Sequence, residues 1–128
     1  MLRYAIFVAL GAVVGSILRW KIGGFCNSFI SYFVLGTLLV NLIGSYLIGL
    51  VIPLGNHYVT LSPEIKLFFI TGFLGSFTTF STFSAEVTQL IFHRQYFLGL
   101  GIMLLHVGGS VIMTFLGVLT MKGVLFNR

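Results

Sequence analysis

The chain has 128 residues, of which 58% are hydrophobic and only 7% are charged, and its mean hydropathy is +1.12. A soluble domain carries about 25% charged residues, so this chain lacks the side chains that a water-facing surface needs. Its net charge of +5 does not indicate nucleic-acid binding, because the basic residues lie near the ends of apolar segments, where anionic lipid headgroups are the natural partners. Composition therefore predicts one integral membrane domain over residues 1–128.

Four segments without formal charge are each close to or beyond the roughly 20 residues that a helix needs to cross a bilayer. They are Tyr4–Leu18, Ile22–Pro63, Leu67–Ala85 and Gln95–Met121. We therefore expect an all-α fold with four transmembrane helices. No small-residue cleavage site follows the first apolar run, so it is interpreted as a retained span and not as a signal peptide. Cys26 is the only cysteine, which excludes an internal disulfide.

The first span is predicted from about Arg3 to Ile22. Gly11 and Gly15 form a small-xxx-small pattern that lets helix backbones approach closely. Near the end of the span, Arg19 lies beside an aromatic residue and a second cation, as in an interfacial belt. Arg19 is then either an anchor at the headgroups or a fixed positive charge that attracts an anion toward a vestibule. A short connection with two glycines is expected over residues 23–28.

The second span is predicted over about Phe33–Leu54, and the stretch Pro53–Asn56 is expected to end it. Thr37, Asn41 and Ser45 recur every four residues and therefore share one helix face. An amide in hydrocarbon is costly unless it finds partners, so Asn41 should face protein or a water-filled cavity. It either joins helices through hydrogen bonds or lines a pore as a donor.

The third span, about Ile65–Phe92, begins with a capping serine, a proline and an acid at Ser62–Glu64. Within it, Thr71–Glu86 combines two glycines, seven hydroxyl residues, four phenylalanines and a carboxylate. This composition predicts that the helix breaks near its middle, over residues 72–79. Non-helical backbone at membrane depth requires burial in protein or a wet cavity, so the break is interpreted as an ion site. The alternative is that the glycines permit tight packing and the hydroxyls bond to their own helix.

The second half of this span is expected to begin with Thr78 or Thr79 as its cap. Phe80 and Phe83 follow on one side of the helix, with Ser84 nearby. Phenylalanine in a membrane usually packs against lipid or a core. Its ring edge also carries positive potential, which suits contact with a small anion, and both interpretations remain open.

Two other groups of polar side chains lie inside the apolar segments. Glu86 is the only acid well within them, and an intramembrane ionisable group is a functional candidate by default. His106, Ser110 and Thr114 recur every four residues in the fourth span, predicted over about Tyr96–Val124. The three align along one helix face as a polar track, although His106 alone is equally consistent with a hydrogen bond in the core.

The distribution of basic residues gives almost no preference for one orientation in the membrane. With four spans, one side carries Arg3, Lys66, Lys122 and Arg128, and the other carries Arg19, Lys21 and Arg94. Copies inserted in both orientations can pair about a two-fold axis in the membrane plane, as inverted repeats do in transporters. Four helices are also too few to enclose a pore lined by three of them, so we expect a dimer.

The third-span sequence Gly72–Ser84, GFLGSFTTFSTFS, resembles the signature of the small fluoride channels of the Fluc or CrcB type. The stretches Leu18–Trp20, Gly36–Gly44 and Gly109–Thr114 fit the same family in the same order. The resemblance implies an antiparallel, dual-topology homodimer with two fluoride pores in the cytoplasmic (inner) membrane. It also implies a structural sodium ion at the dimer interface, held by the carbonyls of Gly75 and Thr78 from both subunits.

Carried over position by position, the resemblance assigns an ion pathway and a cation at the vestibule. These residues are Asn41, Phe80, Phe83, Ser110 and Thr114 for the pathway, and Arg19 for the vestibule. Ser84 and His106 are added to the predicted pathway from their place beside these residues in the sequence pattern. Three positions depart from the pattern of many or some members. Ser76 replaces a second glycine, Ile102 replaces a tyrosine and so removes an aromatic pore contact, and His106 replaces a smaller hydroxyl residue.

The function that the resemblance implies is passive export of fluoride, without enzymatic activity. Hydrogen fluoride enters neutral and dissociates, and an inside-negative potential then drives the anion out with about 2.3 kcal/mol per charge per 100 mV. No phosphate-binding loop or nucleophile–base pair argues for catalysis. The alternative is a small proton-coupled multidrug exporter, which would want a carboxylate in the first span, where this chain has none. A third class, a non-transporting scaffold, would have no use for the break or the polar track.

Overall fold

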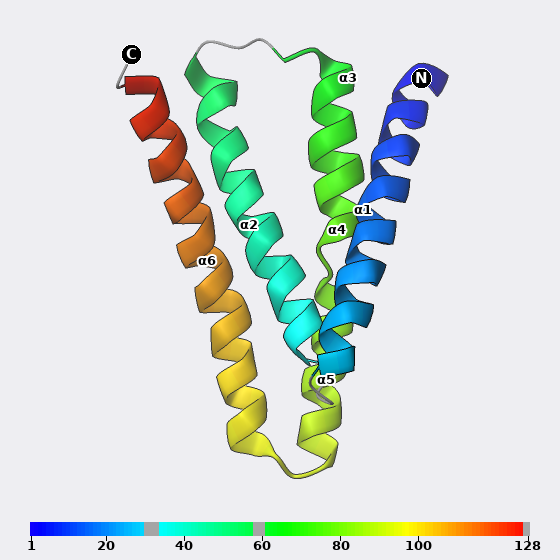
Figure 1. Ribbon diagram of the computed structural model, residues 1–128, viewed down its shortest axis with the longest axis vertical. Coiled ribbons are helices and arrows are strands. Elements are labelled where there is room, and N and C mark those ends of the chain that lie inside the picture. Colours follow the sequence, from blue (N-terminus) through cyan, green and yellow to red (C-terminus); the bar gives the residue numbers. More distant parts are fainter. Residues whose placement is uncertain (30–33, 58–60, 127–128) are drawn as a thin grey trace.

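The computed structural model describes residues 1–29, 34–57 and 61–126, and every regular element in this part of the chain is helical. In chain order the elements are α1 (Leu2–Phe29), α2 (Val34–His57), α3 (Pro63–Lys66), η1 (Leu67–Leu74), α4 (Gly75–Phe77), α5 (Phe80–Phe92) and α6 (Tyr96–Phe126). The elements α3, η1, α4 and α5 follow one another along a single composite span, beside the long helices α1, α2 and α6 (Figure 1). Within the described residues, four stretches are long and apolar enough to cross a membrane. The prediction of an all-α protein with four such helices is confirmed.

The first helix is longer than the sequence indicated. The expected connection at residues 23–28 is helical and belongs to α1, which continues to Phe29. Arg19 therefore lies ten residues before the helix end and not at it. Packing explains the difference, because a Cβ atom on Gly36 of α2 would lie only 3.0 Å from the Cα of Gly23. Glycine lowers helix propensity by about 1 kcal/mol, but here it lets two backbones approach closely.

The second helix also continues beyond its expected end. Pro53 is buried inside α2 and does not end it; the helix runs on to His57, one residue beyond the stretch Pro53–Asn56 that was expected to end it. A proline removes one backbone hydrogen bond from a helix, and the burial of the Pro53 ring offsets that loss. The expected start at Phe33 lies outside the described residues.

Glycines allow close contact at two helix crossings. A Cβ atom on Gly11 would collide with the backbone of Phe68, and one on Gly15 would collide with the backbone of Phe73; both phenylalanines belong to the third span. Between α2 and α6, Gly49 and Gly117 face each other in the same way. The packing role predicted for Gly11 and Gly15 is confirmed, and α1 lies along the first half of the third span as a result (Figure 1).

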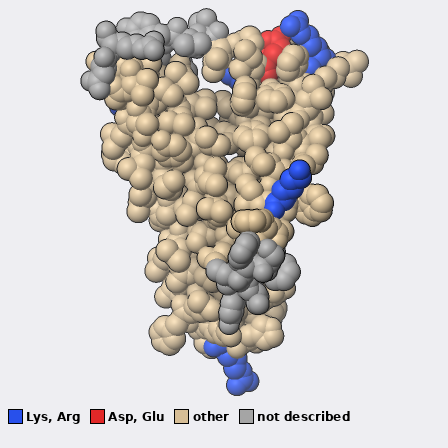
Figure 2. Space-filling model, in the orientation of Figure 1, with Lys and Arg blue, Asp and Glu red and all other residues tan. Residues whose placement is uncertain are grey.

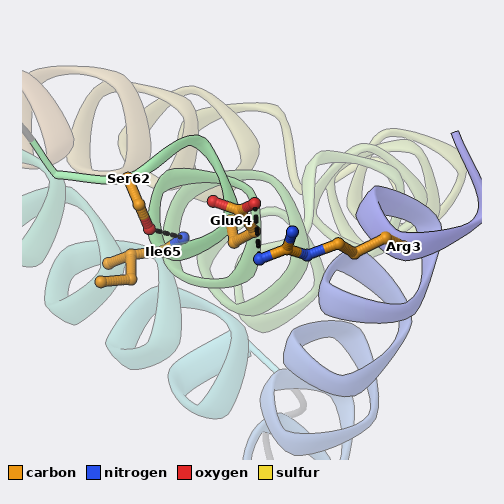
Figure 3. A network of polar contacts seen from close by, with 4 residues as sticks. All are labelled: Arg3, Ser62, Glu64 and Ile65. Carbon is orange, nitrogen blue, oxygen red and sulfur yellow. Dashed lines mark hydrogen bonds and ion pairs between the residues drawn. The ribbon is translucent and has the colours of Figure 1, made fainter.

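The third span is joined from pieces of different geometry. The four-residue helix α3 is capped by Ser62, whose side chain accepts a hydrogen bond from the N–H of Ile65 at 3.4 Å (Figure 3). This confirms the predicted helix start. The next eight residues, η1, form a π-helix, a wide turn that is uncommon and often lies near functional sites. A short α4 follows it and ends at Phe77.

The surface is apolar over most of its area, as a hydrocarbon environment requires. Figure 2 shows a face that is almost wholly uncharged, with charged atoms near the two ends and one basic group along the flank. At one end, Nη2 of Arg3 lies 3.1 Å from Oε1 of Glu64 and ties α1 to α3 (Figure 3). The buried apolar cluster is small and joins α5 to α6. It consists of Phe83, Val87, Leu90 and Ile102, with Met103 packed against it.

Candidate functional site

The backbone of the third span leaves helical geometry at two threonines. Thr78 has φ −83° and ψ 160°, and Thr79 has φ −151° and ψ 117°, so both are extended. Helix α5 then begins at Phe80, and the hydroxyl of Thr79 accepts a hydrogen bond from the N–H of Thr82 at 3.3 Å. The prediction that Thr78 or Thr79 caps this half is confirmed for Thr79. Gly75, by contrast, has helical dihedral angles.

The side chain of Asn41 replaces the hydrogen bonds that a continuous helix would give Thr79. The N–H of Thr79 donates to Oδ1 of Asn41 at 2.8 Å, and Nδ2 of Asn41 donates to the carbonyl of Thr79 at 3.1 Å. Buried backbone polar groups require such partners. Asn41 of α2 therefore holds the extended residues in place, and Nδ2 also lies 3.2 Å from Nδ1 of His106 in α6.

A cavity of about 540 Å³ lies beside this contact, between α2, the pieces of the third span and α6. Its wall includes five of the seven predicted pathway residues. They are Asn41, Phe80, Phe83, His106 and Ser110. Gly75 and Thr78, the two predicted sodium ligands, also line it. The sequence-predicted residues from three spans are thus brought together around one space.

Two predicted pathway residues do not line this cavity. Ser84 lies one turn along α5, where its carbonyl accepts the hydroxyl of Thr88 at 2.8 Å. The hydroxyl of Thr114 lies 3.1 Å from the carbonyl of Ser45 and 2.9 Å from that of Ser110. Backbone carbonyls therefore already accept the one hydroxyl hydrogen that Thr114 has to donate.

Aromatic rings form one side of the cavity. The rings of Phe80 and Phe83 lie edge to face, with centroids 5.5 Å apart and an interplanar angle of 62°. The ring of Phe83 also stacks on the imidazole of His106, with centroids 4.4 Å apart. Phe83 is buried, whereas Phe80 is 76% exposed in the single chain. The ring of Phe83 is thus held by packing, whereas the ring of Phe80 touches Phe83 but is otherwise largely uncovered within the chain.

A second cavity, of about 430 Å³, lies on the other side of Thr79. Arg19, Thr82 and Glu86 line it, and Thr79 lines both cavities. The hydroxyl of Thr37 donates a hydrogen bond to Oε1 of Glu86, whose other oxygen has no hydrogen-bond partner among the described residues. Arg19, the predicted vestibule cation, reaches this cavity, and its Nη1 lies 3.5 Å from the carbonyl of Thr78.

Sequence reasoning missed two of these relationships. Thr37 shares a helix face with Asn41, but nothing in the pattern showed that it would meet Glu86. The tie from Ser76 to α1 was also missed: its hydroxyl lies 3.0 Å from the carbonyl of Ala12. The one available signal was that these residues are polar inside apolar segments, where each must find a partner.

Comparison with known proteins identifies the family. Residues 6–118 match the family described as CrcB-like protein, Camphor Resistance (CrcB). The chain belongs to this family. The matched range of this CrcB-like chain contains every residue that lines either cavity. The resemblance noted in the sequence is therefore confirmed over most of the chain.

Relatives with assigned names share the same length of sequence. The chain is 50% identical over 117 residues to a protein of Haemophilus ducreyi named fluoride-specific ion channel FluC. The aligned residues cover 91% of this chain and 90% of that protein. A protein of the same name from Pseudomonas putida is 48% identical over 120 residues, or 94% of each chain. Another from Nitrosospira multiformis is 47% identical over 115 residues, or 90% of each chain.

Proposed function

We propose that this chain is a fluoride channel that lets the anion leave the cell passively down its electrochemical gradient. The observation that carries the proposal is the wall of the first cavity, which combines an amide, an imidazole, a hydroxyl and two phenylalanine rings. None of the described residues that line it is Lys, Arg, Asp or Glu. The names of the relatives from three bacteria support the choice of fluoride.

A neutral wall of this kind suits a small, tightly hydrated anion. Fluoride loses its water only where successive donors replace it, and conduction also requires that every site release the ion again. A cationic side chain on the path would hold fluoride too firmly, whereas neutral donors and ring edges hold it weakly. The membrane potential supplies the driving force, so the protein catalyses no covalent reaction and is not an enzyme.

The pathway that we propose uses the residues around the cavity and continues along α6. His106, Ser110 and Thr114 are four residues apart, so successive side chains rise by about 6 Å along the helix. The anion would pass the rings of Phe80 and Phe83 and then follow His106 and Ser110, with Ser84 near the start of α5. Thr114, whose hydroxyl hydrogen is taken by backbone carbonyls, would border the end of this path. Arg19 in the second cavity would attract the anion before it loses its water.

We infer further that two copies of the chain assemble as an antiparallel homodimer in the cytoplasmic (inner) membrane. Phe80 of the cavity wall is 76% exposed, and Gly75 beside the extended residues is exposed as well. A second copy would cover both and complete the wall that one chain leaves open. Lipid would cover the other apolar faces, including that of α6, where many large side chains are exposed.

The carbonyls of Gly75 and Thr78 fit the structural sodium ion that the family resemblance implies. Backbone carbonyl oxygens are hard ligands, which sodium prefers as other hard cations do. Helical bonding is interrupted after Gly75, because the N–H of Thr79 donates to Asn41. The contact of Thr78 with Arg19 is long, at 3.5 Å, and a carbonyl oxygen has a second lone pair. Sodium would join the two copies there and take no part in conduction.

The proton-coupled exporter is the weaker alternative. Such a protein needs a carboxylate in its first span, and α1 contains no acid. Glu86 lies in α5, where a hydrogen bond from Thr37 holds it at the second cavity. The relatives are also named as ion channels and not as exporters.

Ion efflux from liposomes tests the proposal. Purified protein reconstituted into vesicles loaded with both fluoride and chloride should release fluoride within seconds to minutes after the potential is clamped, and should retain chloride. The measurement needs no proton gradient, and protein-free vesicles are the control. Equal efflux of both anions, or a requirement for a pH gradient, would contradict the proposed function.

A further inference from the structure

The side-chain amide of Asn41 has only one orientation that satisfies its neighbours. Its oxygen accepts from the N–H of Thr79 at 2.8 Å, and its nitrogen donates to the carbonyl of the same residue at 3.1 Å. If the amide were turned over, its nitrogen would face the N–H of Thr79, donor against donor, and its oxygen would face the carbonyl of Thr79, acceptor against acceptor. The backbone of Thr79 therefore decides which atom of the amide is the nitrogen, a choice that usually has to be made from the hydrogen-bond network.

This orientation decides where the imidazole of His106 carries its proton. Nδ2 of Asn41 lies 3.2 Å from Nδ1 of His106. An amide nitrogen only donates, so Nδ1 must accept with its lone pair, and the proton of the neutral ring is then on Nε2. The ring is 4% exposed and is stacked on Phe83, so packing holds it in this contact.

As a consequence, Asn41 and His106 differ in whether they have an N–H left to donate. The two hydrogens of the Asn41 amide are both used, one by Thr79 and one by His106. Nε2 of His106 is buried and has no hydrogen-bond partner among the described residues. A buried donor without a partner is uncommon and calls for an explanation.

We propose that Asn41 is a positioning residue that selects the Nε2–H tautomer of His106, and that this N–H is the nitrogen donor that the cavity offers to the anion. The proposal rests on the fluoride pathway proposed above. In the opposite tautomer, Nε2 would present a lone pair to the anion and repel it. A backbone contact in the third span thus sets the hydrogen-bonding character of a side chain in α6, with Asn41 as the link between them.

The tautomer itself is measured by nitrogen NMR, without any transport assay. Protein with ¹³C,¹⁵N-labelled histidine, in lipid at alkaline pH, contains three labelled rings, and the His106→Gln spectrum identifies the one that belongs to His106. We expect a protonated Nε2 and a bare Nδ1 in the native chain. A protonated Nδ1 in the native spectrum would overturn the proposal.

The role of Asn41 is tested by Asn41→Asp, which keeps the shape of the side chain. A carboxylate still accepts from Thr79, but it presents an oxygen to Nδ1 of His106, so the ring proton should move to Nδ1. Tyr46→Phe is the matched control, because it removes another bond between α2 and α6, from the Tyr46 hydroxyl to Thr120 at 3.3 Å. The control should leave the His106 spectrum unchanged.

A proton that stays on Nε2 in Asn41→Asp would show that Asn41 does not select the tautomer. If that variant does not assemble, Asn41→Ser replaces it. A serine hydroxyl is too short to reach the ring, so the two tautomers should then exchange and give averaged nitrogen shifts. An unaveraged Nε2–H signal in Asn41→Ser would equally refute the selection.

The donor role is tested by two amides at position 106. The nitrogen of glutamine lies about as far from the backbone as Nε2, whereas asparagine reaches only as far as Nδ1. His106→Gln should keep fluoride efflux within about threefold of the native rate, and His106→Asn should lower it about tenfold, the equivalent of one hydrogen bond. Equal rates for both variants would remove Nε2–H from the pathway. Native protein with the expected spectrum but no fluoride efflux would refute the proposed function and leave the tautomer assignment standing.

Discussion

The two cavities that meet at Thr79 have walls of opposite character. The first has neutral donors and aromatic rings, and the second has Arg19 and Glu86. A fixed charge raises the local concentration of an ion that is still hydrated. In a space where the ion has lost its water, the same charge would bind it too strongly for release. The difference indicates that charged side chains suit the second cavity, where a hydrated anion would be attracted, and that neutral side chains suit the first cavity, where a dehydrated anion would pass.

A charge placed in the neutral cavity should have the largest effect on transport. Ser110→Asp should lower fluoride efflux at least about 100-fold, because two charges about 4 Å apart interact by about 4 kcal/mol at an effective dielectric constant of 20. Ser110→Asn, of the same shape but neutral, is the control and should lose less than about tenfold. Efflux is measured in liposomes at equal protein density. Similar losses in both variants would mean that shape and not charge decides passage.

Removing the contact that separates the cavities should have the next largest effect. Asn41→Leu leaves the N–H and the carbonyl of Thr79 without their partners, and each buried polar group left unpaired costs about 1–3 kcal/mol. We expect efflux to fall at least about tenfold and the melting temperature in detergent to fall as well. Unchanged efflux would show that Asn41 only joins helices and that the extended residues persist without it.

The charge in the second cavity should matter less and should depend on salt. Arg19→Gln is expected to lower efflux about threefold at low ionic strength and hardly at all near 1 M salt, where the screening length is only about 3 Å. Lys21→Gln removes an exposed cation two residues away that does not line either cavity. It is the control and should behave like the native chain at all salt concentrations. Equal effects of both variants would support an anchoring role for Arg19.

The smallest effect is expected at the ion pair outside both cavities. Arg3→Gln breaks the contact with Glu64. The Arg3 side chain is 76% exposed and that of Glu64 is 14% exposed, and a pair with one partner in solvent contributes about 0–1 kcal/mol. Fluoride efflux should stay unchanged, and the melting temperature should shift by no more than a few degrees. A large loss of transport in this variant would place part of the pathway near the start of α1, outside both cavities.

Much of the fold follows from local composition. Long uncharged stretches specify membrane helices, and the pattern at Ser62–Glu64 specifies where the third span begins. The helix ends were harder to predict: residues 23–28 and Pro53 are helical although glycine and proline occur there, because α1 and α2 approach closely at Gly23 and Gly36 and Pro53 is buried. Glycine and proline weaken a helix by a local term, which packing between helices outweighs.

The candidate site, like the fold, could be predicted only in part. Its residue types were recognisable, since polar side chains inside apolar segments are costly and so indicate function. Their partners were not recognisable, because residues that meet in space lie far apart along the chain. Thr79 is 38 residues from Asn41, and His106 is 65 residues from Asn41. Thr37 and Glu86 form a pair of the same kind, 49 residues apart.

The membrane class, the four helices, the family and the stretch in which the third span changes geometry could be predicted from the amino-acid sequence alone. All of these depend on residue types and their local spacing. The bond from Asn41 to the backbone of Thr79, the two cavities that meet there, and the nitrogen of His106 that faces Asn41 became apparent only in the folded structure. The reason is that hydrogen bonds and cavities between helices depend on which faces meet, and glycine contacts such as Gly49 with Gly117 set those faces.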